Sequence, residues 1–449
     1  MQLNKLTDSF CCFFYINYLE LMNKILISLP LFLFSFFGFF DFEKPLRNHE
    51  MTLCGSENQG FQMTGLQSGG NLVTDTPVNF AMDPSLSYAM PMLSAISEQK
   101  TMLTWTEKDE KGEVAFCLAF SENKDLNFSD KKVIFRGMGI GNSRMMRAKV
   151  LVKKDGKLVA VFSNREEVPA EPGKRPKRAS NIVYCESVDN GNTWTSPKAV
   201  DTDPAKLVRG FFDAIVLPND EIAVVYLKDV ENSTKHEERN LRLALTKNAV
   251  FQPERIIDPV VCDCCPINLY LDKNQHLNVI YRDNNNDIRD MVRMVSKDNG
   301  LSFSKPEIVY QDNWKIAGCP HQGAVSTQNQ KEGYLMWFAG AENEQGYRLT
   351  TLAGKKLAII DEASAKEPWL TSNKSLSVLI WQQNKNDEQL SMVAFKKLAN
   401  GVSSETQWLE NSSKTMNVSG ILLEKQLLIA REVLGENKKN TLAITKANI

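Results

Sequence analysis

Histidine is scarce in this 449-residue chain, which contains only His49, His236, His276 and His321. A metal centre built on three histidines would use nearly all of them, so the sequence disfavours such a centre. The formal net charge is −1, from 53 basic and 54 acidic side chains. This balance disfavours a nucleic-acid-binding protein and a polybasic membrane-surface protein. Nine cysteines are too few for a disulfide-dense small scaffold.

Long stretches with helical periodicity are also missing. From about residue 70 onward, short strand-like segments alternate with turns rich in Gly, Asn and Asp. This pattern is typical of an all-β fold. The length alone would allow two or three domains, although a single closed all-β domain can also be long.

The N-terminal part carries one apolar run, Ile25–Phe40, of sixteen uncharged residues behind Lys24. A spanning helix needs ~20 apolar residues, whereas a secretory signal needs ~7–15. Met22 would then be the true start, with an upstream extension before it. Because no small-residue cleavage site follows the run, an uncleaved membrane anchor is the alternative. We therefore expect a signal peptide or anchor over residues 1–45, a linker over 46–69, and export to the periplasm, the outer surface or the medium.

Two segments share the pattern S-x-D-x-G-x-x-[WF] followed by a strand, at residues 187–194 and 296–303. The Ser and Asp side chains of such a turn accept hydrogen bonds from backbone N–H groups, the Gly supplies a positive φ, and the aromatic packs inward. A weaker copy lies at residues 121–128, and residues 246–251 look like a shortened one. The motif therefore indicates a repeated hairpin turn rather than a catalytic element.

This pattern resembles the Asp-box, or BNR repeat, of the sialidase-like β-propellers of the neuraminidase superfamily. The resemblance implies an all-β propeller of four-stranded antiparallel blades, with the box as the turn between strands three and four. The copies lie 66 and 109 residues apart, and 109 is about two units of 54. Over residues 70–449 this spacing favours seven blades, with six, the usual number in catalytic sialidases, as the alternative.

The last blade lacks a fourth strand of its own. We expect an N-terminal strand around Asn71–Ala81 to supply it, which would close the ring and remove a free sheet edge. The expected innermost strands of the seven blades are Ala89–Ser97, Arg147–Lys153, Phe211–Leu217, Pro266–Leu271, Gln322–Thr327, Glu367–Ser372 and Met416–Leu422.

Propeller geometry places the loops between strands two and three, and the segments that lead into each blade, at one end, the top face. Function usually lies where loops converge on a rigid scaffold. Three unusual segments should meet there: residues 261–266 (VCDCCP), 281–290 (YRDNNNDIRD) and 314–323 (WKIAGCPHQG). Further charged residues expected on the same face are Arg144, Arg147, Arg209 and Asp213.

The cysteines of these segments have three interpretations. Export would allow Cys319 to form a disulfide with Cys262, Cys264 or Cys265. Alternatively, Cys262-x-x-Cys265 with Cys319-x-His321 offers soft ligands for zinc or copper. A reactive thiol is the third interpretation. Haem attachment is disfavoured because Pro266, not His, follows the Cys-x-x-Cys.

The arginines and aspartates also allow two interpretations. Arg282 with Asp283, and Arg289 with Asp290, could form ion pairs that hold a solvated loop. Alternatively, these four residues are catalytic, with the arginines clamping a carboxylate or sulfate and an aspartate donating a proton. The candidate ligand-binding residues are Arg147, Arg209, Asp213, Trp314, Lys315 and His321. Trp314 could stack on a sugar or pack between blades, and His236 is expected to be solvated.

Together these motifs resemble a group of exported bacterial sialidase-like proteins over residues 80–430. Catalytic sialidases use three arginines, a Tyr nucleophile paired with Glu, and an acidic residue. Here residues 48–135 contain no arginine and no tyrosine follows Tyr347, so this machinery is incomplete. We therefore expect a propeller that binds or processes a glycan or an anionic small ligand at its top face. The alternatives are a glycoside hydrolase using the Arg/Asp set and a metal-binding propeller using the cysteines.

Overall fold

The protein is described here from a computed structural model, which covers residues 71–122, 126–168, 177–233, 238–386, 390–424, 426–436 and 439–449. These residues belong to one compact unit, Gln67–Ile449. The expected signal or anchor and linker, and His236, lie outside the described residues. Within the described ranges, no helix is long and apolar enough to cross a membrane.

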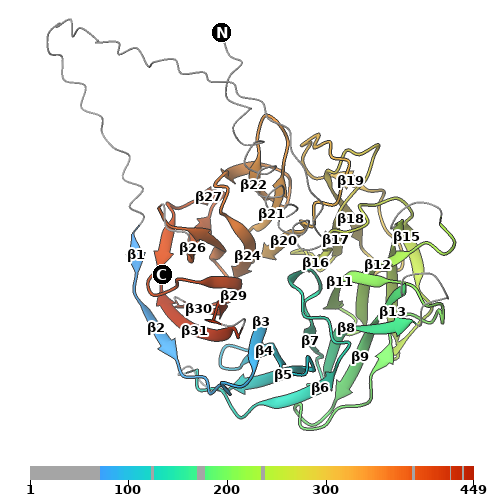
Figure 1. Cartoon of the computed structure of the whole chain (residues 1–449). Coiled ribbons are helices and arrows are strands. Elements are labelled where there is room, and N and C mark those ends of the chain that lie inside the picture. Colours follow the sequence, from blue (N-terminus) through green and yellow to red (C-terminus); the bar gives the residue numbers. More distant parts are fainter. Residues whose placement is uncertain are drawn as a thin grey trace, which may run out of the picture. The chain divides into compact units, whose positions relative to one another are not determined.

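The described residues form seven sheets, antiparallel except for one short N-terminal strand, that follow one another along the chain around a common axis (Figure 1). This confirms an all-β propeller and seven blades rather than six. Blades 1 and 2 consist of β3 (Ser87–Ala95), β4 (Thr101–Lys108), β5 (Val114–Ser121) and β6 (Lys132–Gly137), then β7 (Lys149–Val152), β8 (Leu158–Val168), β9 (Lys177–Ser187) and β10 (Lys198–Ala199). A 3-10 turn, η1 (Arg144–Met146), leads into blade 2.

The middle blades have the same plan. Blade 3 consists of β11 (Arg209–Val216), β12 (Ile222–Asp229), β13 (Arg239–Lys247) and β15 (Arg255–Asp258), with a short hairpin strand β14 (Val250–Phe251). Blade 4 consists of β16 (Asn268–Leu271), β17 (Leu277–Arg282), β18 (Met291–Ser296) and β19 (Glu307–Ile308). Blade 5 consists of β20 (Ala324–Gln328), β21 (Gly333–Ala339), β22 (Gly346–Thr351) and β23 (Lys356–Ile360).

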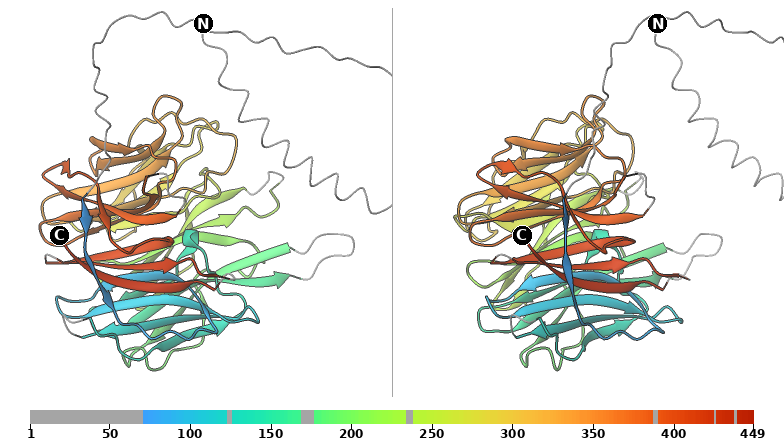
Figure 2. Two further views of the ribbon diagram at one scale, coloured as in Figure 1. Left: turned by 60° about the vertical axis from the view of Figure 1, so that its left-hand side comes forward. Right: turned by 90° about the vertical axis from the view of Figure 1, so that its left-hand side faces the viewer.

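The N-terminal strands complete the last two blades. Blade 6 holds β24 (Lys366–Ser372), β25 (Ser377–Asn384), β26 (Ser391–Ala399), β27 (Val402–Ser403) and β28 (Gln407–Leu409), and blade 7 holds β29 (Thr415–Leu423), β30 (Gln426–Val433) and β31 (Thr441–Asn448). The strand β2 (Asp75–Val78) pairs antiparallel with β31, which confirms the expected closure (Figure 2). The sequence did not predict β1 (Leu72–Val73), which pairs in parallel with β28. The N-terminal segment thus fastens two blades.

Apolar side chains between neighbouring blades form the core. Second strands such as β4 and β12 are buried over almost their whole length because both faces contact another blade. Phe116 of β5, for example, packs on Phe162 of β8 with ring centres 5.9 Å apart. Burial on both faces explains why these strands read as nearly continuous apolar runs.

An aromatic residue occupies the fifth position of the second strand in six blades. In blades 3, 4 and 5 its polar group donates a hydrogen bond to an aspartate that precedes the blade, as buried Tyr and Trp side chains require. The pairs are Tyr226 with Asp201 (3.0 Å), Tyr281 with Asp258 (2.5 Å) and Trp337 with Asp312 (2.7 Å). The aspartate lies 23 to 25 residues before the aromatic. This recurring pair anchors each lead-in segment to its blade.

Both near-complete boxes form the expected turn between strands three and four. Gly191 donates to the Ser187 hydroxyl, Asp189 accepts from Thr193, and φ is 82° at Gly191. The second box repeats this arrangement around Asp298, whose pKa falls to about 2 through hydrogen bonds from Ser302. Residues 246–251 form the β13–β14 hairpin. The weak copy at 121–128 lies partly outside the described residues.

Candidate functional site at the top face

Four innermost strands contain a bulge close to their top end. The bulges lie in β3, β11, β24 and β29, and each holds a non-glycine residue with positive φ. These residues are Met90 (54°), Phe211 (52°), Glu367 (54°) and Asn417 (48°). A bulge re-aims side chains, and such a φ costs ~1–3 kcal/mol per residue. Its recurrence at the same level of four blades makes this end of the axis a candidate site.

The three segments expected at the top face do meet. The backbone N–H of Cys262 donates to the carbonyl of Arg282 (3.0 Å), which joins the cysteine segment to the loop of blade 4. The N–H of Arg289 donates to the carbonyl of Trp314 (2.8 Å), and Ile288 forms a bridge with Lys315. The lead-ins of blades 4 and 5 therefore lie on either side of one loop.

Gly323 and Pro266 bring these two lead-ins into direct contact. A Cβ atom at Gly323 would lie 2.6 Å from the carbonyl oxygen of Pro266, whereas one at Gly318 would meet only Ile316 at 3.9 Å. This contact explains why the motif of the blade 5 lead-in ends in Gly.

We therefore expect Gly323→Ala to lower the free energy of unfolding by about 1–3 kcal/mol, because the backbone of Pro266 must move. Chemical denaturation would measure the loss. Gly318→Ala, in the same segment, is the control and should change stability little. Equal stability of the two variants would contradict the close contact.

Arg282 is buried, and its side chain forms hydrogen bonds with the backbone of this region. Its guanidinium donates to the carbonyls of Arg289 (2.6 Å), Phe338 (2.7 Å) and Gln322 (3.2 Å). It also lies 4.9 Å from the ring centre of Trp314. A catalytic or clamping role for Arg282 remains a prediction, and it would require these carbonyl contacts to open.

Trp314 lies between blades rather than on the surface. Its ring packs edge-on against Phe338 at 5.6 Å, and a Cβ at Gly340 would lie 2.8 Å from it. Of the two roles considered for this residue, the geometry favours packing. Neighbouring Lys315 and His321 are exposed and remain candidate ligand-binding residues.

Neither expected ion pair of the blade 4 loop forms, and Arg289 pairs with Asp287 (3.7 Å) rather than with Asp290. Asp290 accepts from the backbone N–H groups of Asn313 and Trp314, and Asp283 accepts from Asn284. Successive strand residues point to opposite faces, so Arg282 turns inward, away from Asp283. Burial raises the pKa of Asp283. Both aspartates thus hold backbone N–H groups of the loop and of the blade 5 lead-in in place. A catalytic role for either aspartate remains a prediction.

Arg209 and Asp213 also lie in polar networks. Arg209 is fully buried and donates to Asp201 (2.6 Å) and to backbone carbonyls of the blade 3 lead-in. Asp213 accepts from Lys149 and from the N–H of Leu269, which links three innermost strands. A ligand-binding role for Arg209 would need its network to open.

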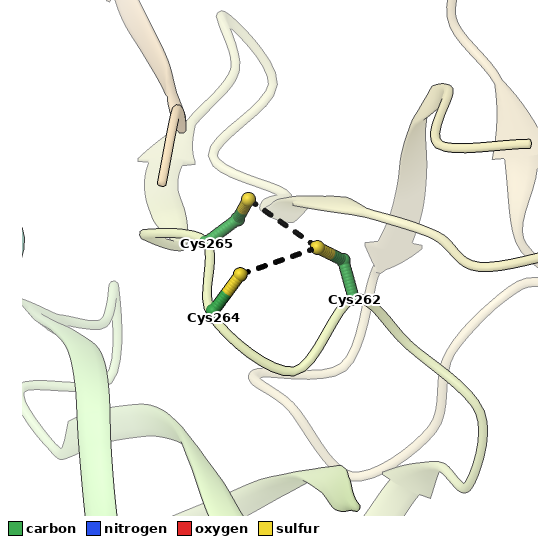
Figure 3. A group of neighbouring side chains, drawn as sticks. All are labelled: Cys262, Cys264 and Cys265. Carbon is green, nitrogen blue, oxygen red and sulfur yellow. Dashed lines mark hydrogen bonds between the residues drawn. The ribbon is translucent and has the colours of Figure 1, made fainter. Parts of the chain in front are cut away.

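The cysteines form a buried thiol triangle, defined as Cys262, Cys264 and Cys265 (Figure 3). The Sγ of Cys262 lies 3.3 Å from that of Cys265 and 3.9 Å from that of Cys264. Cys264 also groups with two exposed donors, Cys319 and His321, and these three ligand atoms lie within 4.8 Å of one another. Every described cysteine is free. The structure thus unites all four candidate cysteines and His321.

Within the triangle, the pKa is lowered at Cys262 and raised at Cys264 and Cys265. Contacts with the thiols of Cys264 and Cys265 lower the pKa of Cys262, and the nearby charge of Arg289 adds to this effect. Burial raises the pKa of Cys265 to about 12. Arg289 is 7% exposed, and its Nε and Nη1 find no hydrogen-bond acceptor of standard geometry among the described residues. One buried cation therefore faces one acidic thiol.

A second group, here named the mouth cluster, surrounds the bulges of blades 6 and 7. Its Arg144 forms an ion pair with Glu367 (3.1 Å). The amide of Asn417 donates from its backbone to Glu367 (3.0 Å) and from its side chain to buried Glu432 (2.7 Å). The cluster consists of Arg144, Arg147, Glu367, Trp369, Asn417 and Glu432. Sequence reasoning named only its two arginines, because no local motif marks the bulged positions.

Tyr347 borders the mouth cluster and was also missed as a site residue. Its hydroxyl donates to the side-chain oxygen of Gln322 (3.2 Å) and contacts the backbone of Glu367. Burial raises the pKa of its hydroxyl. Through Gln322, whose carbonyl accepts from Arg282, the mouth cluster is joined to the blade 4 loop.

Comparison with known proteins agrees with this fold. The family described as BNR repeat-like domain matches residues 101–386, about two thirds of the chain, and the chain belongs to this family. A Dyadobacter fermentans protein has a similar structure, with a TM-score of 0.51 and 10% identity over 85% of this chain and 99% of that one. A comparison with curated proteins gave no match.

Two enzyme structures also match, at lower similarity. A Hadza microbial sialidase has a TM-score of 0.46 and 11% identity over 81% of this chain and 66% of its own. An α-L-arabinofuranosidase from Fusarium graminearum has a TM-score of 0.41 and 12% identity over 84% of this chain and 97% of its own. At 10% identity, the likeness to the Dyadobacter fermentans structure shows the fold alone. The protein is a sialidase-like BNR-repeat propeller.

Proposed function

We propose that the protein binds a glycan carrying a carboxylate or sulfate group at the mouth cluster. The supporting observation is that the hydrogen bonds of the Arg147 guanidinium within the protein are long. Its guanidinium lies at the top end of the axis and reaches the carbonyls of Pro91 and Val418 only at 3.4–3.5 Å. Arg282, by comparison, makes contacts as short as 2.6 Å. Since hydrogen bonds weaken at such distances, Arg147 retains donors for a ligand.

Acidic sugars match the remaining chemistry of the cluster. A guanidinium recognises a carboxylate or sulfate through two parallel hydrogen bonds. Glu367 can accept hydrogen bonds from sugar hydroxyls, and Trp369 offers a half-buried aromatic ring 5.4 Å from Arg147. Burial lowers the pKa of Arg147, a destabilising effect that an anionic ligand would offset. Family membership fits a glycan ligand, because related propellers include sialidases.

Binding of 3′-sialyllactose and of neutral lactose tests the proposal. We expect calorimetry to show binding of the sialylated sugar only, and Arg147→Ala to weaken it at least about tenfold, which is ~1.4 kcal/mol. Arg136→Ala is the control, because Arg136 forms an exposed ion pair with Glu113 on the outer strand of blade 1. Equal binding of lactose, or an unchanged affinity in Arg147→Ala, would contradict the proposal.

Glycoside hydrolysis is a second candidate, favoured by the position of Tyr347 beside Glu367. A tyrosine next to a glutamate is the arrangement that sialidases use for their nucleophile. Release of sialic acid from 3′-sialyllactose, lost in Tyr347→Phe while binding is retained, would establish hydrolysis. Binding without release would leave the protein a lectin-like propeller.

A further inference from the structure

We propose that the thiol triangle binds one thiophilic d10 cation, Zn(II) or Cu(I), with Cys319 or His321 as the fourth ligand. This inference goes beyond the proposed glycan binding, because the mouth cluster takes no part in it. The five candidate donors come from two lead-in segments more than fifty residues apart in the sequence, those of blades 4 and 5.

The sulfur separations fit a shared cation. A Zn–S bond of ~2.3 Å places two sulfur ligands of a tetrahedron ~3.8 Å apart. In the triangle, Cys262 lies 3.9 Å from Cys264 and 3.3 Å from Cys265. A disulfide would require ~2.05 Å, which neither separation approaches. Small side-chain rotations would therefore bring three sulfurs onto one ion.

The number and type of donors select a soft metal. Cys264 belongs both to the triangle and to the exposed group with Cys319 and His321. Four sulfurs and one imidazole suit Zn(II) or Cu(I), whereas Mg(II) and Ca(II) prefer oxygen ligands. Because Cys319 and His321 are exposed while the triangle is buried, they also provide the access route that a buried site needs.

Arg289 supplies a second, independent indication. Three thiolates around a monovalent or divalent cation leave a net negative charge, which is costly in a buried position unless it is compensated. Arg289 is more than nine-tenths buried beside Cys262; its Nη2 lies 3.7 Å from Asp287, and its Nε and Nη1 are unpaired among the described residues. Arg239 fixes the loop by donating to the carbonyl of Asp263 (2.5 Å), between the ligands. This is the charge-balancing and orienting surround typical of a metal centre.

A carboxylate group elsewhere shows the contrast. Asp201, Asp203 and Glu254 also lie close enough to hold a cation. The ammonium of Lys228 already lies 2.7–2.9 Å from all three carboxylates. That group thus already holds a cation of the chain between its carboxylates, whereas the cation beside the triangle, Arg289, lies against Cys262 and Asp287.

Metal analysis of the full chain, purified under reducing conditions and then loaded anaerobically with Zn(II) or with Cu(I), tests the proposal. We expect about one equivalent of either metal to survive gel filtration, and chelator competition to rank the two. Cys264→Ala should lower the retained metal at least tenfold. The matched control is Cys185→Ala, a buried free cysteine in blade 2, which should retain the wild-type amount. Equal metal in Cys264→Ala and wild type would overturn the proposal.

X-ray absorption of the loaded wild-type chain keeps the test decisive if Cys264→Ala fails to fold. We expect a first shell dominated by sulfur at ~2.3 Å. A shell of nitrogen and oxygen only would overturn the site. So would a Cys264–Cys319 disulfide in the chain as purified without reductant, together with failure to bind metal after its reduction. Neither outcome depends on glycan binding, so this proposal and the proposed function fail separately.

Discussion

Replacing Lys228 with methionine is expected to lower the free energy of unfolding by about 3–5 kcal/mol, the cost of removing one partner from a buried ionic network. Lys228 is 1% exposed, and its ammonium contacts Asp201, Asp203 and Glu254. Methionine has a similar volume but leaves these carboxylates with less compensating charge. The blade 3 lead-in, which Arg209 and Asp201 hold together, should loosen first.

Urea denaturation of Lys228→Met and the parent chain measures this loss. The control is Lys374→Met, because Lys374 and its partner Glu98 are 75% and 80% exposed. An exposed pair contributes ~0–1 kcal/mol, so the control should stay close to the parent. A loss in Lys228→Met no larger than in the control would contradict the account of this network.

The same network should also determine how the free energy of unfolding changes at acidic pH. Although burial alone would raise it, contacts with Arg209 and Lys228 hold the pKa of Asp201 at about 2 against 3.8. The stability that Asp201 contributes is therefore complete above pH 3.8 and is lost as the pH falls towards 2. In Lys228→Met this pKa rises, so the loss should begin at a higher pH.

Removing the residues before Asn79 is expected to give the second large effect, a loss of at least about 3 kcal/mol. The deletion takes away four paired positions of β2 on β31 and the parallel pairing of β1 with β28. Each lost backbone hydrogen bond costs ~0.5–1.5 kcal/mol, and the packing of Val73 and Val78 is lost as well. The edge of β31 would then be free to pair with another chain.

Thermal unfolding and light scattering distinguish this outcome. A chain that begins at Asn71 retains both strands and serves as the control, which should remain monodisperse with unchanged stability. We expect the shorter chain to melt earlier and to self-associate. If both chains behave alike, the N-terminal strand does not close the ring.

The sequence predicted the fold in detail because its signals are local. Box turns have fixed side-chain chemistry and their spacing favoured seven blades over six, while the strand pattern placed all seven innermost strands. The strand β2 was predictable from a blade that lacked its fourth strand. By contrast, β1 was not predicted, because a strand of two residues shows no periodicity. The aromatic–aspartate pairs were not predicted either, because they link positions 23 to 25 residues apart.

The site was only partly predictable, for a physical reason. Placement at the top face follows from strand direction, so the meeting of residues 261–266, 281–290 and 314–323 could be foreseen. Whether a given arginine is free depends on three-dimensional partners: Arg282 and Arg209 are engaged by carbonyls and carboxylates, whereas Arg147 is not fully engaged. Glu367 and Asn417 were not predicted as site residues, because the amino-acid composition around them does not indicate a bulge.

Oxidative linkage of Cys264 to Cys319 tests most directly the claim that two distant segments build one site at the top face. The variant would carry Cys262→Ala and Cys265→Ala, be stripped of metal with a chelator, and be oxidised mildly before peptide mass spectrometry. The two sulfurs lie within 4.8 Å, and a disulfide forms only when the Cα atoms are within about 7 Å. The account predicts one intramolecular peptide pair joining residues 264 and 319. Two thiols that stay alkylatable, or that link only between molecules, would contradict it.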